Sequence, residues 1–196
     1  ADIDGTTNLD VVDIDGAVDM ASTLTVTGNV LVGTTTEGIS DYGDTLTIAD
    51  TDHAGMTIRS GTSSEGNVYF SDGTSGDAEY KGIVKYDHSS NAMSFWSNSL
   101  RRVTIDSSGS VGINAVPSAW SGDNGVIQVG NSSVANFSNG AYFTANSYYD
   151  GSNNRYIASD EDSRYYQASG THIWQTAAAG TAGDAISFSE KNAPRH

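Results

Sequence analysis

The chain has 196 residues and a formal net charge of −15, with 24 acidic residues against nine basic ones. Such a surface repels phosphate backbones and anionic headgroups, which argues against nucleic acids and membrane surfaces as partners. The sequence contains no cysteine, which excludes disulfides and thiolate metal sites. No apolar run approaches the ~20 residues that a membrane-spanning helix needs.

Residues 1–58 are predicted to form a repetitive, acidic shaft. The motif Asp2-Ile3-Asp4-Gly5 recurs eleven residues later as Asp13-Ile14-Asp15-Gly16, and the first basic residue is Arg59. One short extended segment and one glycine turn per unit cannot bury a core alone, so the units must stack on neighbours or on identical chains. Calcium binding by the aspartates is weighed against turn-stabilising roles, which are favoured. No metal or other cofactor is expected.

An apolar–Thr–apolar triplet recurs at residues 24–26, 46–48, 56–58 and 103–105. Strand alternation puts the two apolar side chains on one face and Thr on the other. We expect the apolar face to enter a core between chains and Thr to face outward. Residues 24–32 and 103–113 continue through a glycine into a second apolar segment and predict β-hairpins. Residues 68–73 and 83–96 carry similar turn signals.

The composition favours an all-β fold. Val, Ile and Thr number 45, whereas Leu occurs only five times, and no segment carries a helical apolar stripe. Short strands with narrow apolar faces leave exposed edges and little burial in a lone chain, which predicts identical chains around one axis. We divide the sequence into the shaft, a β-rich middle region at residues 59–117 and a distal aromatic-rich region at residues 118–196.

The distal region carries the candidate recognition residues. Tyr and Trp among small polar neighbours suit adaptable binding surfaces, and Arg is a frequent energetic anchor. Alternation along a strand would bury one member of each adjacent tyrosine pair and expose the other, and would place His172 and Trp174 on one face. The predicted receptor-binding set is Tyr148, Tyr149, Arg155, Tyr156, Arg164, Tyr165, Tyr166 and Trp174.

Catalytic signals are weak throughout the sequence. The histidines show no metal-ligand spacing, and no Gly-x-Ser-x-Gly elbow occurs before a helix. The tightest acidic cluster, Asp160-Glu161-Asp162, would alternate between strand faces rather than converge. We therefore expect no catalytic residues and no enzyme activity.

Several of these segments in order resemble the tail-fibre proteins of bacteriophages, marine ones especially. They include Met56 to Gly61, Asn67 to Thr74, Ile83 to His88, Met93 to Trp96, Val103 to Ile113, Tyr156 to Asp160 and Thr171 to Trp174, together with the opening Asp-Ile-Asp-Gly repeats.

The resemblance implies an elongated fibrous homotrimer with a β-spiral or β-prism shaft and short antiparallel hairpins. It also implies an extracellular place in the virion tail, contact with other tail or virion proteins, and binding of a bacterial surface glycan or outer-membrane protein. Two alternatives stay open: a bacterial surface adhesin of β-solenoid type, and a glycan-depolymerising tail spike.

Overall fold

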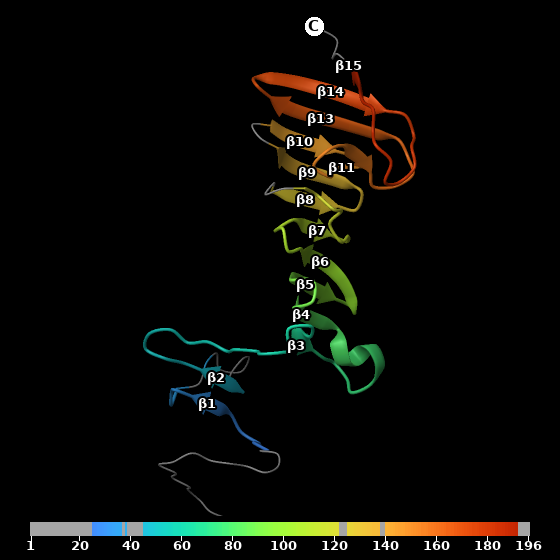
Figure 1. The fold of residues 1–196 in the computed structure, drawn as a ribbon. Helices are drawn as coiled ribbons and strands as arrows, with labels where there is room; N and C mark the ends of the chain where they lie inside the picture. The colour runs from blue at the N-terminus through green and yellow to red at the C-terminus, as the bar shows by residue number, and fades with distance from the viewer. Residues whose placement is uncertain (1–24, 37, 39–44, 122–124, 138–139, 192–196) are drawn as a thin grey trace, which may run out of the picture. The chain divides into compact units, whose positions relative to one another are not determined.

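The computed structural model (Figure 1) describes residues 25–36, 38, 45–121, 125–137 and 140–191. Contacts between residues divide the chain into two compact units, Ala1–Thr57 and Ile58–His196. The fold is all-β, as predicted, with one short 3-10 helix and no α-helix among the described residues. The Asp-Ile-Asp-Gly repeats lie outside the described residues, and the three-region division of the sequence stays a prediction.

The elements, in chain order, are β1 (Val30–Val32), β2 (Leu46–Ile48), β3 (Glu65–Phe70), η1 (Gly76–Tyr80), β4 (Gly82–Asp87), β5 (Ala92–Ser97), β6 (Leu100–Ile105), β7 (Val111–Ile113), β8 (Val126–Val129), β9 (Ser132–Phe137), β10 (Gly140–Thr144), β11 (Ser147–Tyr149), β12 (Asn154–Tyr156), β13 (Asp162–Ala168), β14 (Thr171–Ala177) and β15 (Ser189–Lys191).

In the first unit, β1 and β2 form a two-stranded parallel sheet. The predicted hairpin over residues 24–32 is therefore wrong in its described part, because β1 pairs with β2 and residues 25–29 form no strand. Gly28 lacks the positive φ that a tight hairpin turn needs. Gly33 does have a positive φ of 75°, and a Cβ there would lie 2.1 Å from the Ala49 carbonyl oxygen.

The second unit is built on one sheet of eleven strands, in the order β15-β14-β13-β10-β9-β8-β7-β6-β5-β4-β3. All neighbours in it are antiparallel except β7 and β8, which are parallel. Figure 1 shows these strands stacked one above another, largely in chain order. Strands β11 and β12 form a separate antiparallel pair. No helix among the described residues has the length and apolar character to cross a membrane.

The predicted hairpin over residues 103–113 is confirmed by the pairing of β6 with β7. Its turn is closed by Asp106, whose carboxylate accepts hydrogen bonds from the backbone N–H groups of Ser108 and Ser110, both at 2.9 Å. Gly109 supplies the positive φ of 81°. The predicted return of residues 83–96 is likewise confirmed, as the β4–β5 hairpin.

Two other local predictions are wrong. The connection after β3 is not a tight turn at Gly73 but an eleven-residue segment, residues 71–81, which contains η1. The triplet at residues 56–58 lies outside any strand, and its side chains Met56 and Ile58 are 61% and 46% exposed. Triplet alternation alone does not supply a neighbouring strand, and pairing decides whether an extended segment becomes part of a sheet.

Apart from Arg102 at the β-bulge, the registers assign the strand residues of the large sheet to one of two faces. One face carries a column of directly opposed residues that runs across ten strands without a break. In order from β3 to β14 the column is Gly66, Tyr86, Met93, Ile105, Val111, Ile127, Val134, Phe143, Tyr165 and Trp174. We call this the open face, and its opposite the covered face.

The covered face holds the buried strand residues of the large sheet, and most of them are small or polar. They are Ile83, Ser94, Thr104, Gly112, Val126, Gln128, Ser133, Ala135, Gly140, Thr144, Asp162 and Ala177. The predicted alternation of residues 103–105 is confirmed, since Thr104 lies opposite in direction to Val103 and Ile105. The expectation that Thr faces solvent is wrong at this triplet, because Thr104 is only 2% exposed.

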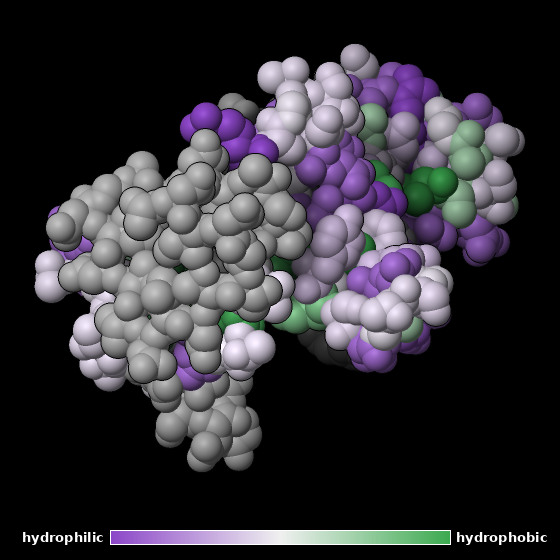
Figure 2. Space-filling model, turned by 90° about the horizontal axis from the view of Figure 1, so that it is seen from below, coloured by the Kyte–Doolittle hydropathy of each residue, from purple (hydrophilic) through white to green (hydrophobic). Residues whose placement is uncertain are grey.

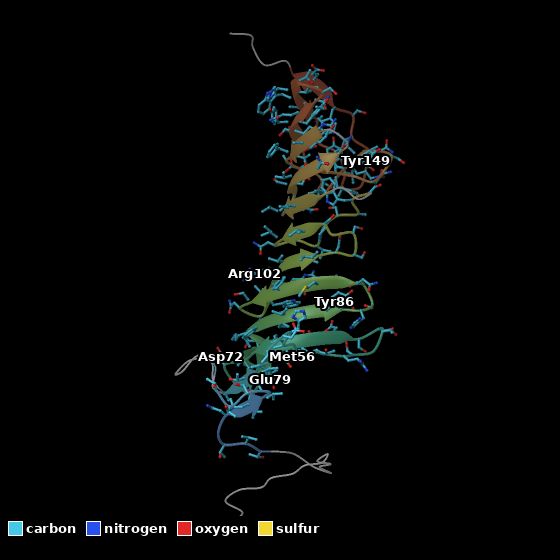
Figure 3. The ribbon with its side chains drawn as sticks, turned by 90° about the vertical axis from the view of Figure 1, so that its left-hand side faces the viewer. Met56, Asp72, Glu79, Tyr86, Arg102 and Tyr149 are labelled. Carbon is cyan, nitrogen blue, oxygen red and sulfur yellow. The ribbon has the colours of Figure 1, made fainter. Side chains whose placement is uncertain are left out.

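The chain covers that face with its own connections. The segment after β7 packs so closely that a Cβ on Gly112 would lie 2.4 Å from the Ala115 carbonyl oxygen and 2.9 Å from Pro117 Cδ. Strands β11 and β12 add a further layer, and Figure 3 shows the segment around Tyr149 to one side of the main sheet. Burial on the covered face is therefore supplied within the chain.

Candidate functional site

The open face gathers the exposed hydrophobic side chains of the large sheet. Strands β3–β14 contain eleven exposed large hydrophobic residues, and ten of them share this face. The ten are Phe70, Tyr86, Phe95, Leu100, Ile113, Ile127, Val129, Val134, Phe143 and Trp174, with exposed fractions from 38% to 60%. Figure 2 views the molecule from below, and its coloured residues are mostly purple and white with a few green hydrophobic ones between them.

The amount of apolar surface is large for a single chain. Five of the ten residues are aromatic, and at about 150–250 Å² each and roughly half exposed these alone present on the order of 500 Å², to which the five aliphatic side chains add. The largest apolar patch of an ordinary monomer is about 300–600 Å², whereas each partner in a stable protein complex buries about 800 Å². The open face therefore has the size of a protein interface.

Between β3 and β14 the open face carries little fixed charge, and the first charged residue in its column is Lys191 of β15, opposite Trp174. Glu65, Lys85, Asp87, Asp162 and Arg164 are registered on the covered face, and Arg102 at the β-bulge in β6 has no register partner. At the β-bulge between β5 and β6, Arg101 is paired with Trp96, which also belongs to the covered face. In a chain of net charge −15, this is a surface on which two copies can meet without electrostatic repulsion.

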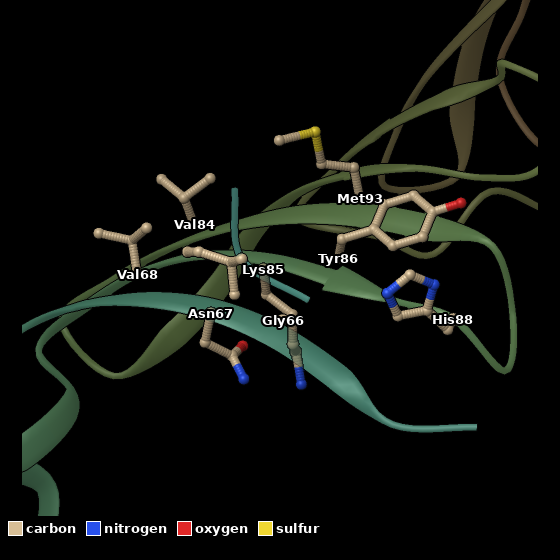
Figure 4. Close-up of a pocket in the computed structure, with 9 residues that line it drawn as sticks. Gly66, Asn67, Val68, Val84, Lys85, Tyr86, His88 and Met93 are labelled. Carbon is tan, nitrogen blue, oxygen red and sulfur yellow. The ribbon is translucent and has the colours of Figure 1, made fainter. Parts of the chain in front are cut away.

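Shallow grooves follow the open face. One, of about 250 Å³, is shown in Figure 4, where Val68, Val84 and Met93 project to one side of the strands and Asn67 to the other. A second, of about 260 Å³, lies between Val129 and Phe143. Both are lined mainly by apolar surface and offer packing volume rather than polar groups.

Aromatic rings dominate the end of the open face nearest β14. The Tyr165 ring lies 4.5 Å from the Trp174 ring and 6.1 Å from that of Phe143, measured between centroids. His172 shares this face with Trp174, as predicted, and its Nδ1 contacts the Tyr165 hydroxyl. A groove of about 480 Å³ runs beside these rings and is bordered by Ser132 and Thr176.

Two predicted receptor residues pack on the covered side around Trp120, which is 7% exposed. The Tyr148 ring meets the Trp120 ring edge-on at 6.1 Å, and the Tyr149 ring meets the Phe137 ring at 5.6 Å. Buried Gln128 fixes the cluster, because its Oε1 accepts hydrogen bonds from Trp120 Nε1 at 3.0 Å and from the Ser118 N–H at 2.9 Å.

Arg164 and Tyr166 form a second stack on the covered side. The Tyr166 ring lies parallel to the Tyr142 ring at 4.8 Å, and the Arg164 guanidinium lies 5.3 Å from the Tyr166 ring centre and 3.8 Å from that of Phe188. Burial lowers the pKa of Arg164. Its Nε donates to Gln175 Oε1 at 2.8 Å. Cation–π contacts of this kind attach residues near β15 to the sheet.

Arg155 and Tyr156 are held by internal contacts. Arg155 Nε forms an ion pair with Asp150, and its Nη1 donates to the Gly183 carbonyl oxygen at 2.9 Å. The pKa of Asp150 is lowered to about 2, first by the backbone N–H of Asn153 and then by Arg155. Tyr156 is 6% exposed, and its hydroxyl donates to the Ala178 carbonyl oxygen at 2.5 Å.

The predicted receptor set thus falls into two groups on opposite sides of the sheet. Tyr165 and Trp174 lie on the open face, and the other six members lie on the covered side. The prediction that one tyrosine of each adjacent pair is buried and the other exposed is wrong, because Tyr148, Tyr149, Tyr165 and Tyr166 are all half-buried. Receptor contact by any of them stays a prediction.

Sequence reasoning missed Trp120, Phe137 and Gln128 as organisers of the distal region. Trp120 follows shortly after Pro117, at a predicted boundary between regions, and no sequence pattern predicts its hydrogen bond to Gln128. Among the described residues, no group of three or more His, Cys, Asp or Glu could hold a metal ion. No family model, curated protein or solved structure matches the chain.

Proposed function

We propose that this chain is a structural segment of a bacteriophage tail fibre, which assembles with copies of itself and presents a surface that recognises the host. The open face is the observation that carries the proposal. A soluble chain that buries Ser, Thr and Gln on one face and exposes Val, Ile and Phe on the other gains stability only when the second face is covered.

The sheet geometry favours copies wound around one axis. Neighbouring strands of a sheet are rotated by roughly 20–25°, so an apolar column across ten strands winds about the direction in which they stack. Two flat sheets would lose contact along such a column, whereas copies related by rotation about that direction keep it. The resemblance to tail fibres sets the number of copies at three, as a fibrous homotrimer with a prism-like core.

Binding, not turnover, is the proposed mechanism. Three copies would present three identical sites, so weak contacts with a bacterial glycan or outer-membrane protein gain avidity. The acidic first 58 residues would act as a spacer in the virion tail and join other tail proteins. The predicted recognition residues on the covered side, around Tyr149 and Arg155, would then face outward from the axis.

Cell binding tests the proposed role. The full chain, fluorescently labelled, should bind whole cells of some strains in a bacterial panel and should release no reducing ends from their surface polysaccharides. Release of reducing ends would favour the depolymerising spike. Absence of binding to every strain, with a properly assembled protein, would contradict host recognition.

A further inference from the structure

The aromatic end of the open face continues the aliphatic part of the same column. Ile127 is directly opposite Val134, which is opposite Phe143, and the register then passes to Tyr165 and Trp174. Residues in one register column of a sheet project in the same direction and meet the same neighbour. A partner that packs on Ile127 and Val134 must therefore extend to Trp174 or end beside it.

Building on the proposed function, we infer that Phe143, Tyr165 and Trp174 contact the open face of a second copy of this chain. Tyr165 and Trp174 then hold copies together and do not contact the receptor. Receptor contact is left to the side chains and loops of the covered side.

Charge identifies the occupant as a second copy. When identical faces meet about a rotation axis, each charged residue approaches its own equivalent, so such faces must be uncharged. In β13 and β14 the residues registered on the open face are Ser163, Tyr165, Gln167, His172, Trp174 and Thr176, none of them Asp, Glu, Lys or Arg. The column meets a charged residue only in the end strand β15, where Lys191 is opposite Trp174. The opposite, covered face of strands β3–β14 does carry charged residues, among them Glu65, Lys85 and Asp162.

The exposure and the local volume agree with that occupant. Trp174 and Phe143 are 51% and 47% exposed in the single chain. The groove of about 480 Å³ beside them is lined by both rings together with Ser163 and Thr176, and Arg164 and Gln175 of the covered face reach its border. It has the size of a ligand pocket, and aromatic side chains of a facing copy would fill it while the hydroxyls at its border find polar partners.

The absence of cysteine allows a direct test by crosslinking. Facing sheets lie about 10 Å apart, which exceeds the reach of a disulfide, so a short bis-maleimide is the appropriate reagent. The full chain carrying Trp174→Cys should yield covalent dimers on denaturing electrophoresis. Val116→Cys, at a residue outside the strands that is 53% exposed, should not.

The outcomes separate this inference from the proposed function. Crosslinking of Val129→Cys but not of Trp174→Cys would show that copies associate without the aromatic end, which overturns the inference and leaves the assembly intact. Absence of crosslinks at both positions, with a monomeric mass, would overturn the assembly itself. Trp174→Phe should retain both assembly and cell binding; a Trp174→Phe protein that assembles fully but no longer binds cells would assign Trp174 to the receptor and overturn the inference.

Discussion

Tyr69 and Phe70 are neighbours in β3 with nearly equal exposure, 55% and 60%, yet they project from opposite faces of the sheet. Phe70 lies on the open face. Tyr69 lies on the covered face, at an end of that face where the covering segments leave it exposed. The pair therefore isolates the effect of the face from the effects of residue size, exposure and position along the chain.

Substitution of these two residues by Asp should have unequal effects on assembly. Phe70→Asp places one carboxylate per copy at the interface between chains, where desolvation and repulsion between equivalent charges oppose association. Tyr69→Asp leaves the carboxylate in solvent. Sedimentation velocity should show a loss of the assembled species for Phe70→Asp alone. Equal behaviour of the two variants would contradict the assignment of the open face.

The buried hydroxyls of the covered face should respond in opposite directions to replacement by Val. Thr104 Oγ1 is buried with no hydrogen-bond partner among the described groups, so Thr104→Val should be neutral or stabilising by up to about 1 kcal/mol. Thr144 Oγ1 contacts Ser133 Oγ at 2.7 Å and donates to the Ser147 carbonyl oxygen at 3.0 Å. Thr144→Val should therefore destabilise by about 1–3 kcal/mol. Urea unfolding midpoints of Thr104→Val and Thr144→Val, measured at one fixed protein concentration, test this. A lower midpoint for Thr104→Val than for Thr144→Val would show that the hydroxyl of Thr104 is hydrogen-bonded in solution.

Gln128→Ala should loosen the distal aromatic cluster. It removes the acceptor of Trp120 Nε1 and the donor to the Gly130 carbonyl oxygen, 2.8 Å away. Buried groups left without partners cost on the order of 3 kcal/mol together. In a Trp96→Phe, Trp174→Phe background, the emission of Trp120 should shift to longer wavelength. An unchanged emission spectrum and urea midpoint would mean that ring packing alone holds Trp120.

Acid should weaken the β11–β12 loop through Asp150. Its pKa is lowered to about 2, with the backbone N–H of Asn153 as the first cause and Arg155 as the second. The unfolded chain has a value near ~3.9, so the folded state favours the ionised form. The stabilisation is complete above pH ~4 and is lost as the pH falls toward about 2.

The control for this loop is Asp150→Asn, which keeps an acceptor oxygen but cannot ionise. The difference in thermal midpoint between the natural chain and this variant should be largest near neutral pH and should shrink as the pH falls toward about 2. A difference that is constant over that range would assign the effect to the Asp150 hydrogen bonds rather than to its charge.

The fold class and several hairpins could be predicted because they depend on local signals. Asp106 and Gly109 encode the β6–β7 turn by side-chain capping and a positive φ, and both features are visible in the sequence. The parallel contacts β1–β2 and β7–β8 could not be predicted, because long connections and not turns bring those strands together.

Alternation in the sequence separates the two faces of a strand but does not say what covers each face. Alternation assigns Thr104 and Ile105 correctly to opposite faces, yet the polar one is buried, and its partner Gly112 in β7 lies against the segment around Pro117. The distal aromatics show the same limit. Tyr156 and Trp174 are both aromatic strand residues of the distal region, but long-range packing buries the first at 6% exposure and leaves the second at 51%.

Native mass spectrometry of the full chain tests the central claim most directly, because the account depends on copies covering the open face. The account predicts a single dominant species of three chains. The same measurement on Val129→Asp should show its loss, while Val116→Asp, at a residue of nearly equal exposure, should retain it. A monomeric mass for the natural chain, together with a β-rich circular dichroism spectrum, would contradict the account.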